Sequence, residues 1–277
     1  MKIVEGKQDI LQRRDPVKLR EELREKLTPE EIRELGVNLG AGSDHPRAFV
    51  GPPFVYDMLG GLQMQLLLDL GMREYHRFLE VGCGSLRLGR MAIPYLLNGR
   101  YFGVEPNQKI LDGGCELHFG APMAESQVIK AKGAKFSNTE DFDFSFTEGP
   151  VDFVFAQSIA SHTGIDLTKK LLSAFASVSH DDTIVMVTYV RTMRVERSNT
   201  EDGWFYPECV LYTDDAFGEM ARAAGFYAYR TVWPLGNVTE EGLISTQHPT
   251  ILTRKPWAPS AAQMTAGGYV NGIAQIN

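Results

Sequence analysis

The sequence predicts an α/β fold: a doubly wound, mostly parallel seven-stranded sheet with an antiparallel edge hairpin and an N-terminal helical extension. Two observations carry this prediction. Short apolar runs rich in β-branched and aromatic residues alternate with segments whose leucines recur at helical spacing. The last two runs have no helix between them, which favours antiparallel pairing. The predicted strands cover residues 77–81, 101–104, 128–136, 151–156, 183–190, 226–233 and 246–253.

The helices alternate with these strands and carry recognisable ends. Thr28, Pro29 and Glu31 are typical of a helix start, with a threonine cap, proline at the first position and a capping-box glutamate. Gly225 is placed to end the last helix. We expect helices over residues 16–36, 54–70, 86–97, 107–118, 166–178 and 213–225. The predicted organisation is a helical extension over 1–50, a main domain over 51–255 and a weakly patterned tail over 256–277.

Composition narrows the class of protein. The chain has 277 residues, enough to bury a sizeable core, and a formal net charge of −7, which disfavours nucleic acid as a partner. Its three cysteines form no C-x-x-C pair, so reduced cysteines in the cytoplasm are expected. No apolar run is long enough to span a membrane, and the N-terminus lacks the apolar core of a signal peptide. The charged N-terminal helices and the tail are candidates for self-association into a homo-oligomer.

A nucleotide-type site is predicted at the end of the first two strands. Gly82 and Gly84 allow a sharp turn and close approach of a ligand, and Glu105 ends the next strand, where a carboxylate accepts bonds from ribose hydroxyls. The dinucleotide fingerprint requires a third glycine where this chain has Arg87. Glu80 ahead of the turn suits an ammonium-bearing ligand better than a pyrophosphate. The pattern therefore favours S-adenosylmethionine over NAD.

The same residues carry a family resemblance. Residues 78–113 resemble motif I and the following strand of class I S-adenosylmethionine-dependent methyltransferases, with residues 80–84 matching the family's acidic-x-Gly-x-Gly core. Leu86 departs from it, because many members have a third glycine there. Residues 152–158 resemble motif IV, the strand that faces the methyl donor. Segments 50–57, 85–87 and 161–164 resemble a bacterial subgroup whose substrates we cannot name.

The resemblance implies a Rossmann-like methyltransferase fold, S-adenosyl-L-methionine as cofactor and a set of binding residues. Residues 80–84 would surround the methionine part, Glu105 would hold the ribose, and the residues after the second and third strands would flank the adenine. In the third strand, Asn138 stands where the family often has an aspartate. The implied cofactor-binding residues are Glu80, Gly82, Cys83, Gly84, Glu105, Pro106, Asn107, Asn138, Thr139, Gln157 and Ser158.

The candidate catalytic residue is His162, in the segment that follows the donor-facing strand. Imidazole titrates near neutrality and suits a general base for a hydroxyl acceptor. Packing or capping in that loop explains the same histidine equally well. Tyr56 and Asp57 are weaker candidates for closing over the cofactor, and Asp166 is expected to cap a helix. The histidines are too scattered in sequence for a metal site.

The leading hypothesis is methyl transfer to a hydroxyl of a small molecule or glycan, with His162 as base. The alternatives are N- or C-methylation with a structural His162, and a non-catalytic binding protein on the same fold. The insertion over 191–212, with Trp204, Phe205 and Tyr206, follows the fifth strand and is a candidate acceptor pocket. A plain surface loop is the competing interpretation. The base amino-methyltransferase signature is absent, since residues 157–160 occupy its place.

Overall fold

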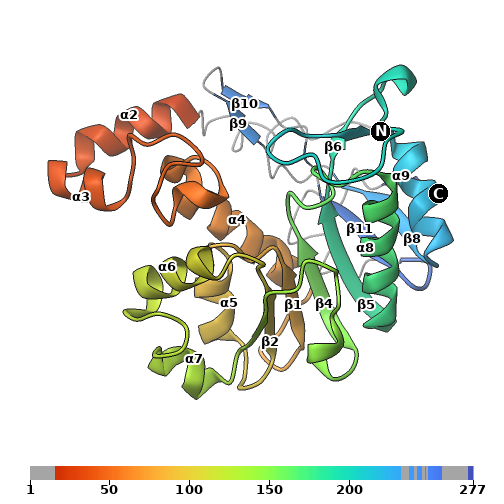
Figure 1. Cartoon of the computed structure of the whole chain (residues 1–277), viewed down its shortest axis with the longest axis horizontal. Coiled ribbons are helices and arrows are strands. Elements are labelled where there is room, and N and C mark those ends of the chain that lie inside the picture. The colour runs from red at the N-terminus through yellow and green to blue at the C-terminus, as the bar shows by residue number, and fades with distance from the viewer. Residues whose placement is uncertain are drawn as a thin grey trace.

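The computed structural model describes residues 16–231, 237–239, 242–244, 247, 249–257 and 274–276. Part of the predicted extension (1–15) and of the predicted tail (258–273 and 277) lies outside the described residues. Figure 1 shows a sheet with helices on both faces and the N-terminal helices standing to one side. The helices are α2 (Pro16–Lys26), α3 (Pro29–Glu34), α4 (Tyr56–Asp69), α5 (Gly89–Tyr95), α6 (Gln108–Phe119), α7 (Gln127–Lys132), α8 (Ile165–Ser177) and α9 (Asp214–Ala223), with 3-10 turns η1 (Ala48–Val50), η2 (Pro53–Val55), η3 (Ser145–Thr147) and η4 (Val195–Arg197).

The main sheet has the order β12-β8-β11-β5-β4-β1-β2-β3. Strands β3, β2, β1, β4 and β5 are parallel, whereas β11 runs antiparallel to both of its neighbours, β5 and β8. The strands are β1 (Phe78–Val81), β2 (Tyr101–Val104), β3 (Lys135–Ser137), β4 (Val151–Ala156), β5 (Ser179–Thr188), β8 (Tyr227–Arg230), β11 (Pro249–Thr253) and β12 (Ala274–Gln275). The predicted doubly wound sheet with its antiparallel edge is confirmed, and β12 adds an eighth strand from the predicted tail.

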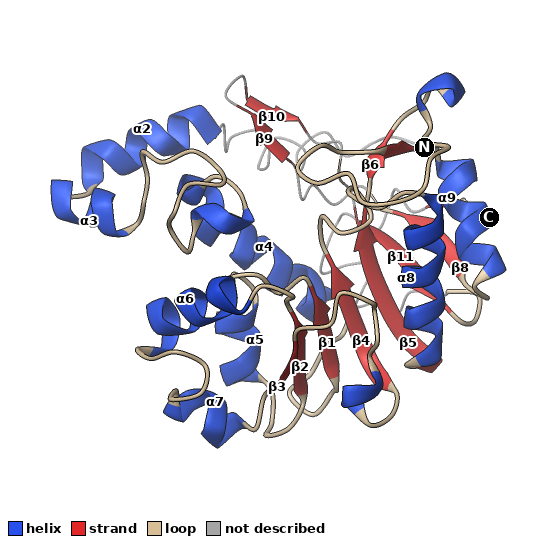
Figure 2. Cartoon of the chain, viewed as in Figure 1, coloured by secondary structure: helices blue, strands red, loops and turns tan. Residues whose placement is uncertain are grey.

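Alternating side chains divide the core between the two faces of the sheet. Leu79 and Val81 of β1 face α8 and α9, together with Leu171 and Phe217. Phe78 belongs to the opposite face with residues of α4, α5, α6 and α7. Figure 2 shows these two helical layers around the red strands. Strands β1 and β2 are buried at every residue and β4 at every residue but Asp152, as is usual for central parallel strands.

Three secondary-structure predictions needed correction. The strand predicted over 128–136 is a helix in its first half: α7 is capped by Ser126, whose hydroxyl accepts a bond from the Ile129 amide, and is ended by left-handed Gly133. Only β3 remains as strand. The helix predicted over 16–36 is broken into α2 and α3, because Thr28 forms its capping box inside that range. The helix predicted over 86–97 begins later, at Gly89, after a turn in which Leu86 has φ 61°.

The carboxyl ends of the parallel strands meet along one edge, where the connecting segments gather. The insertion after β5 is bounded by β6 (Val190–Arg191) and β7 (Leu211–Tyr212), which pair in parallel. A small antiparallel pair, β9 (Asn237–Thr239) and β10 (Gly242–Ile244), forms a separate sheet. Within the described ranges, no helix combines the length and apolar character needed to cross a membrane.

Candidate functional site

The glycine turn after β1 is tightly enclosed. Gly82 and Gly84 have φ of 71° and 54°, conformations that favour glycine. A Cβ at Gly82 would overlap Ile159 in the segment after β4, and a Cβ at Gly84 would overlap Val50 from η1. The amides of Gly82 and Cys83 both donate to the Val104 carbonyl at 2.9 Å. The turn therefore joins three segments: the end of β2, the segment after β4 and the N-terminal region.

Glu105 lies directly against this turn. Its Oε2 accepts a hydrogen bond from the Gly84 amide at 3.2 Å, and its Oε1 accepts one from the Asn107 amide at 2.9 Å. Burial raises the pKa of this carboxyl, while the two amides oppose the rise. A carboxylate offers about four acceptor positions, so two amide bonds leave capacity for further donors. The side chain is thus fixed in orientation and still able to accept hydroxyl donors.

Glu80 is more deeply placed than the sequence interpretation implied. It is buried on β1, and its Oε2 accepts a hydrogen bond from the Tyr101 hydroxyl at 2.7 Å. Burial raises the pKa of Glu80 to about 8, although the Tyr101 bond and the charge of Arg87 oppose the rise. Burial also raises the pKa of the neighbouring Cys83 thiol. This corner of the site holds a carboxyl that is largely protonated at neutral pH.

Gln157 and Ser158 directly follow β4 and belong to a polar network. Ser158 has φ 59°, its amide donates to Thr188 Oγ1 at 2.9 Å, and its hydroxyl donates to Gln247 Oε1 at 3.0 Å. Gln157 Oε1 accepts from Gln63 Nε2 at 2.5 Å. The sharp, non-glycine turn points to a position that its surroundings over-determine. The ends of β4 and β5 are therefore fixed relative to each other and to α4.

Gln63 and Arg87 belong to the site although the sequence analysis did not place them there. Gln63 is buried and its Oε1 accepts from Arg87 Nε at 3.3 Å, while Arg87 Nη1 donates to the Val50 carbonyl at 2.7 Å. The available signal was Gln63 itself, a polar residue inside the apolar stripe of its helix. Arg87 had entered only as the residue that breaks the dinucleotide fingerprint.

Tyr56 and Asp57, at the start of α4, contact both the N-terminal segment and the residues that follow the glycine turn. The Tyr56 hydroxyl donates to the Ser85 carbonyl at 2.8 Å and lies 2.8 Å from His118 Nε2, which then acts as donor. Burial raises the pKa of Tyr56 to about 12. Asp57 pairs with Arg47 and Arg90, each at 2.7 Å, and both guanidinium groups lie over the Tyr56 ring. Tyr56 is thus buried and held by contacts within the protein.

His162 lies in the segment after β4 with a defined tautomer. Its Nδ1 is 2.6 Å from the Glu208 carbonyl oxygen, which can only accept, so Nδ1 carries the proton and Nε2 the lone pair. The ring also meets Tyr206 edge-on, with centroids 5.2 Å apart. Asp166, expected as a helix cap, accepts a bond from the Gly203 amide at 2.8 Å instead, and Gly164 occupies the cap position.

The remaining sequence-predicted residues lie at the outer rim of the same edge. Pro106 and Asn107 are exposed, and Asn107 caps α6 by accepting from the Lys109 amide at 3.0 Å. Asn138 uses its Nδ2 to donate to the Glu105 carbonyl at 2.7 Å, and Thr139 follows it. The structure thus brings Gly84, Glu105 and Asn138 together through hydrogen bonds. Among the described residues, no hydrogen bond links His162 to these three residues; His162 lies in the segment that follows β4.

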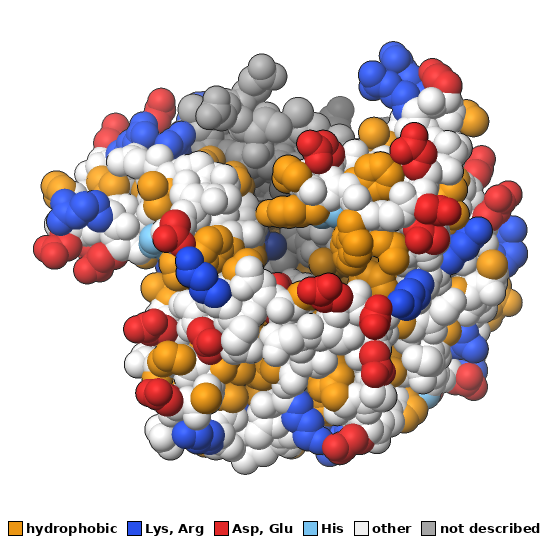
Figure 3. Space-filling view, viewed as in Figure 1, with side chains coloured by type: hydrophobic (Ala, Val, Ile, Leu, Met, Phe, Trp, Pro, Cys, Tyr) orange, Lys and Arg blue, Asp and Glu red, His pale blue; other side chains and the backbone are white. Residues whose placement is uncertain are grey.

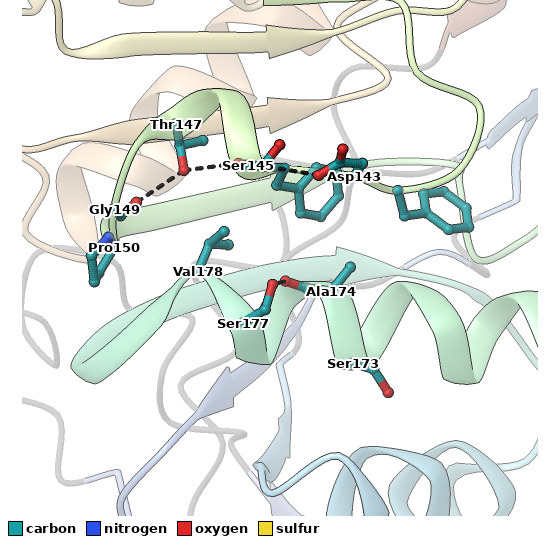
Figure 4. Close-up of a pocket in the computed structure, with 11 residues that line it drawn as sticks. Asp143, Ser145, Thr147, Gly149, Pro150, Ser173, Ala174, Ser177 and Val178 are labelled. Atoms are coloured by element: carbon teal, nitrogen blue, oxygen red, sulfur yellow. Dashed lines mark hydrogen bonds between the residues drawn. The ribbon is translucent and has the colours of Figure 1, made fainter.

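One surface cavity lies away from this edge. It has a volume of about 390 Å³ and is lined by η3 and the second half of α8, near the start of β4 (Figure 4). Its polar groups bond one another: the Thr147 hydroxyl donates to the Gly149 carbonyl, and the Ser145 amide to Asp143. In the part of the chain that the structure describes, no cluster of three or more metal-ligating side chains occurs.

Comparisons with known proteins add likenesses of fold. No protein-family model matches the chain, and no curated protein matches its sequence. A magnesium protoporphyrin IX methyltransferase from Synechocystis PCC 6803 with bound SAM is similar, at 14% identity and TM-score 0.48, over 72% of this chain and 82% of that one. A TehB-like SAM-dependent methyltransferase from Corynebacterium glutamicum matches at 15% identity and TM-score 0.48, over 76% and 92%.

A [4+2]-cyclase, SpnF, is similar to the same degree. It matches at 18% identity and TM-score 0.49, over 70% of this chain and 66% of its own. At these identities and TM-scores the likenesses concern the course of the chain and carry over no ligand or reaction. The function proposed below depends on the residues described above.

Proposed function

We propose that this chain transfers a methyl group from S-adenosylmethionine to a hydroxyl of a small molecule or glycan. The observation that carries the proposal is the hydrogen bond from the Gly84 amide to Glu105. A glycine turn and an acid at neighbouring strand ends are each common alone. Held together at the carboxyl edge of a doubly wound sheet, they form a cradle for an adenosine ribose.

The residues present fit the methyl donor. Glu105 retains acceptor capacity for two ribose hydroxyls, and the partly exposed rim residues Pro106, Asn107, Asn138 and Thr139 would flank the adenine. The backbone of residues 82–84 and the carboxyl of Glu80 would face the methionine part, where a bound ammonium group favours the ionised form of the buried acid. Gln157 and Ser158 would lie near the sulfonium. When bound, adenosylmethionine supplies a methyl group on positively charged sulfur, which needs no further activation.

The chain's own contribution is to position the acceptor and accept its proton. The Glu208 carbonyl holds the His162 Nδ1 proton, leaving the Nε2 lone pair to take the proton of the acceptor hydroxyl as the oxygen bonds to the methyl carbon. The carbon–sulfur bond breaks in the same step, leaving adenosylhomocysteine. Precise positioning can supply most of the rate for such an activated methyl group.

A second reading assigns His162 a structural role, with nitrogen or carbon as the acceptor atom. The observation in its favour is the same Nδ1 contact, because that bond also ties residues 208–209 to the segment after β4. A third candidate is a binding protein that keeps the fold without turnover. The division into an extension over 1–50, a domain over 51–255 and a tail over 256–277, and the cytoplasmic location, are part of the proposal.

Calorimetric titration of the full chain with adenosylmethionine, adenosylhomocysteine and NAD tests the cofactor assignment. We expect the first two to bind and NAD not to bind. Glu105→Ala should weaken adenosylmethionine binding by about tenfold to a hundredfold, because two hydrogen bonds to a charged group are lost. Glu116→Ala removes an exposed acid from α6 and serves as the matched control, with unchanged affinity.

Binding of NAD in place of adenosylmethionine would refute the proposal and favour hydride transfer. Binding of neither ligand would refute both enzyme readings. Equal losses in the Glu105 and Glu116 variants would remove the ribose contact from the argument.

A further inference from the structure

The insertion between β6 and β7 exposes large apolar side chains beside the candidate base. Trp204 is 53% exposed and Tyr206 is 70% exposed. Figure 3 shows hydrophobic side chains gathered along the hollow in the middle of this face, with acidic side chains next to them. Exposed large aromatic side chains are typical of ligand-binding surfaces.

These rings stand on an ordered backbone. The Gly164 amide donates to the Gly203 carbonyl at 2.7 Å, and the Phe205 amide donates to the His162 carbonyl at 2.8 Å. Trp204 forms a β-bridge with Thr163, and Phe205 packs into the core between the two exposed aromatics. The insertion is therefore docked edge to edge on the segment after β4, and its outer side chains have a fixed place.

Tyr206 contacts the candidate catalytic group, and Trp204 pairs through its backbone with Thr163, the next residue in the chain. Tyr206 meets the His162 imidazole with ring centroids 5.2 Å apart, and Trp204 meets Phe142, which follows β3, at 5.8 Å. A hydroxyl within hydrogen-bonding reach of His162 Nε2 lies roughly 3 Å from it. The body of the molecule carrying that hydroxyl then lies against the Tyr206 ring. Aromatic faces bind flat apolar surfaces, such as another ring or the C–H face of a sugar.

The charges around the rings are acidic. Glu201 and Asp202 precede Trp204 in the chain and Glu208 follows Tyr206, all three exposed. Asp166 lies beneath the same segment, and the Gly203 amide holds the pKa of its carboxyl below the usual value, so it stays ionised. Of the arginines in the insertion, Arg191 is paired with Asp214, whereas Arg194 precedes η4, Arg197 ends it, and both are exposed. Glu201, Asp202 and Glu208 are the charged residues nearest to the two rings in the chain, so we expect an anionic occupant to be disfavoured there.

We propose that Trp204 and Tyr206 form a binding platform for the methyl acceptor, which presents a flat, apolar, uncharged ring face beside its reacting hydroxyl. Calling the bound molecule the methyl acceptor rests on the proposed function. The shared chemistry is the ring face, which an aromatic compound or a neutral pyranose supplies. An acidic sugar, a nucleotide or another anion does not fit.

Ligand-observed NMR titration of the full chain with two matched pairs of probes tests the platform. The first pair is 4-hydroxyacetophenone and 4-hydroxybenzoate; the second is methyl β-D-glucopyranoside and methyl β-D-glucuronide. We expect one neutral probe to bind more tightly than its anionic partner, and the pair in which this occurs distinguishes an aromatic from a sugar acceptor. Trp204→Ala and Tyr206→Ala should each weaken that binding by roughly five- to tenfold.

Tyr75→Ala is the matched control, because Tyr75 is 55% exposed and also contacts a histidine ring, but precedes β1 at the opposite edge of the sheet. Its variant should bind the probe as the parent does. The platform is refuted if neither neutral probe binds, if the anionic probes bind better, or if Tyr75→Ala has the same effect. Concentration-dependent self-association that Trp204→Ala abolishes would also refute it, by making this face an interface between copies.

The proposed function is tested separately, by the calorimetric titration with adenosylmethionine. Loss of adenosylmethionine binding in the calorimetric titration would overturn methyl transfer, while probe binding that depends on Trp204 and Tyr206 would still identify the platform.

Discussion

The two rims of the carboxyl edge are built in different ways. The rim formed by the glycine turn, β2 and residues 47–57 is enclosed, and Asp57 in it pairs with both Arg47 and Arg90. The rim formed by the insertion after β5 exposes Trp204 and Tyr206. The first rim offers backbone groups and a fixed carboxylate, whereas the second presents exposed side chains. The contrast fits one ligand of invariant shape and another chosen by side-chain chemistry.

We call the rim of the glycine turn the cofactor rim and the rim of the insertion the acceptor rim. The largest expected effect comes from removing the candidate base, which should impair only the acceptor rim. His162→Ala should lower the turnover number by about a hundredfold to ten-thousandfold, the usual contribution of a positioned base. Its affinity for adenosylmethionine should stay unchanged, because His162 is not among the residues proposed to contact the cofactor. Single-turnover kinetics and calorimetry on the same preparation measure the two quantities.

Cys209→Ala is the control for this variant, since Cys209 Sγ lies 3.9 Å from His162 Nδ1 but offers no base. We expect its turnover to remain close to the parent value. A His162→Ala enzyme that keeps more than about a tenth of its activity would favour the structural role and a nitrogen or carbon acceptor.

The next prediction concerns the close contact between α6 and the glycine turn at the cofactor rim. A Cβ at Gly114 of α6 would overlap the backbone of Ser85, so alanine there must push α6 away from the glycine turn. Overpacking of this kind costs about 1–3 kcal/mol of stability. We expect Gly114→Ala to lower the free energy of unfolding by that amount and to weaken adenosylmethionine binding several-fold, measured by urea titration and calorimetry.

The adjacent Gly113 offers a matched control in the same helix. A Cβ there would lie 3.4 Å from the Pro46 ring, an ordinary contact. Alanine has the better helix propensity, so Gly113→Ala should be neutral or more stable by up to about 1 kcal/mol. Equal destabilisation by the two substitutions would contradict the close approach of α6 to Ser85.

The corresponding variant on the acceptor rim is Gly164→Ala. Its Cβ would lie 2.5 Å from the Glu201 carbonyl oxygen and 2.6 Å from the Asp202 carbonyl carbon, so the insertion must move away from the segment after β4. We expect about a tenfold loss of turnover at subsaturating acceptor, because small displacements of positioning groups are costly. Adenosylmethionine affinity should not change. Reduced cofactor affinity with normal turnover would reverse the assignment of the two rims.

The sequence predicted the cofactor rim better than the acceptor rim, for a physical reason. Strand ends and glycine turns follow from local periodicity, and parallel strands bring their carboxyl ends to one edge, so Gly84 and Glu105 could be placed together in advance. The Gln63–Gln157 contact spans 94 residues and the Arg87–Val50 contact spans 37. Such contacts depend on how α4 and η1 dock, which no local pattern records.

Short elements such as α7 were not predicted from the sequence for a related reason. α7 has six residues, too few for a helical period to be distinguished from a strand, and its signals are the caps Ser126 and Gly133. The ring contact between His162 and Tyr206 depends on the docking of the insertion through Gly164 and Gly203. The sequence could mark the insertion as aromatic but could not say that it faces the histidine.

The smallest expected effect concerns protons at the cofactor rim. Glu80 has a pKa of about 8, raised by burial from the model-compound value of 4.5, and its neighbours are Tyr101, Cys83 and Arg87. At pH 7 the folded chain therefore binds a proton there that the unfolded chain does not. Stability contributed by this proton is full below about pH 4.5 and is lost as the pH rises towards 8. Glu80→Gln should remove that slope from urea titrations between pH 5 and pH 8.

The cofactor should couple to the same proton. A cationic ligand beside Glu80 favours its ionised form, so binding of adenosylmethionine at pH 7 should release a fraction of a proton, and affinity should rise about three- to fivefold from pH 6 to pH 8. Calorimetry in two buffers of different ionisation enthalpy counts the protons released. In Glu80→Gln the release should vanish while the Tyr101 hydroxyl can still donate to the amide oxygen. Release that persists undiminished in this variant would move the titrating group elsewhere in the site, and Glu80 would then be a structural acid of β1.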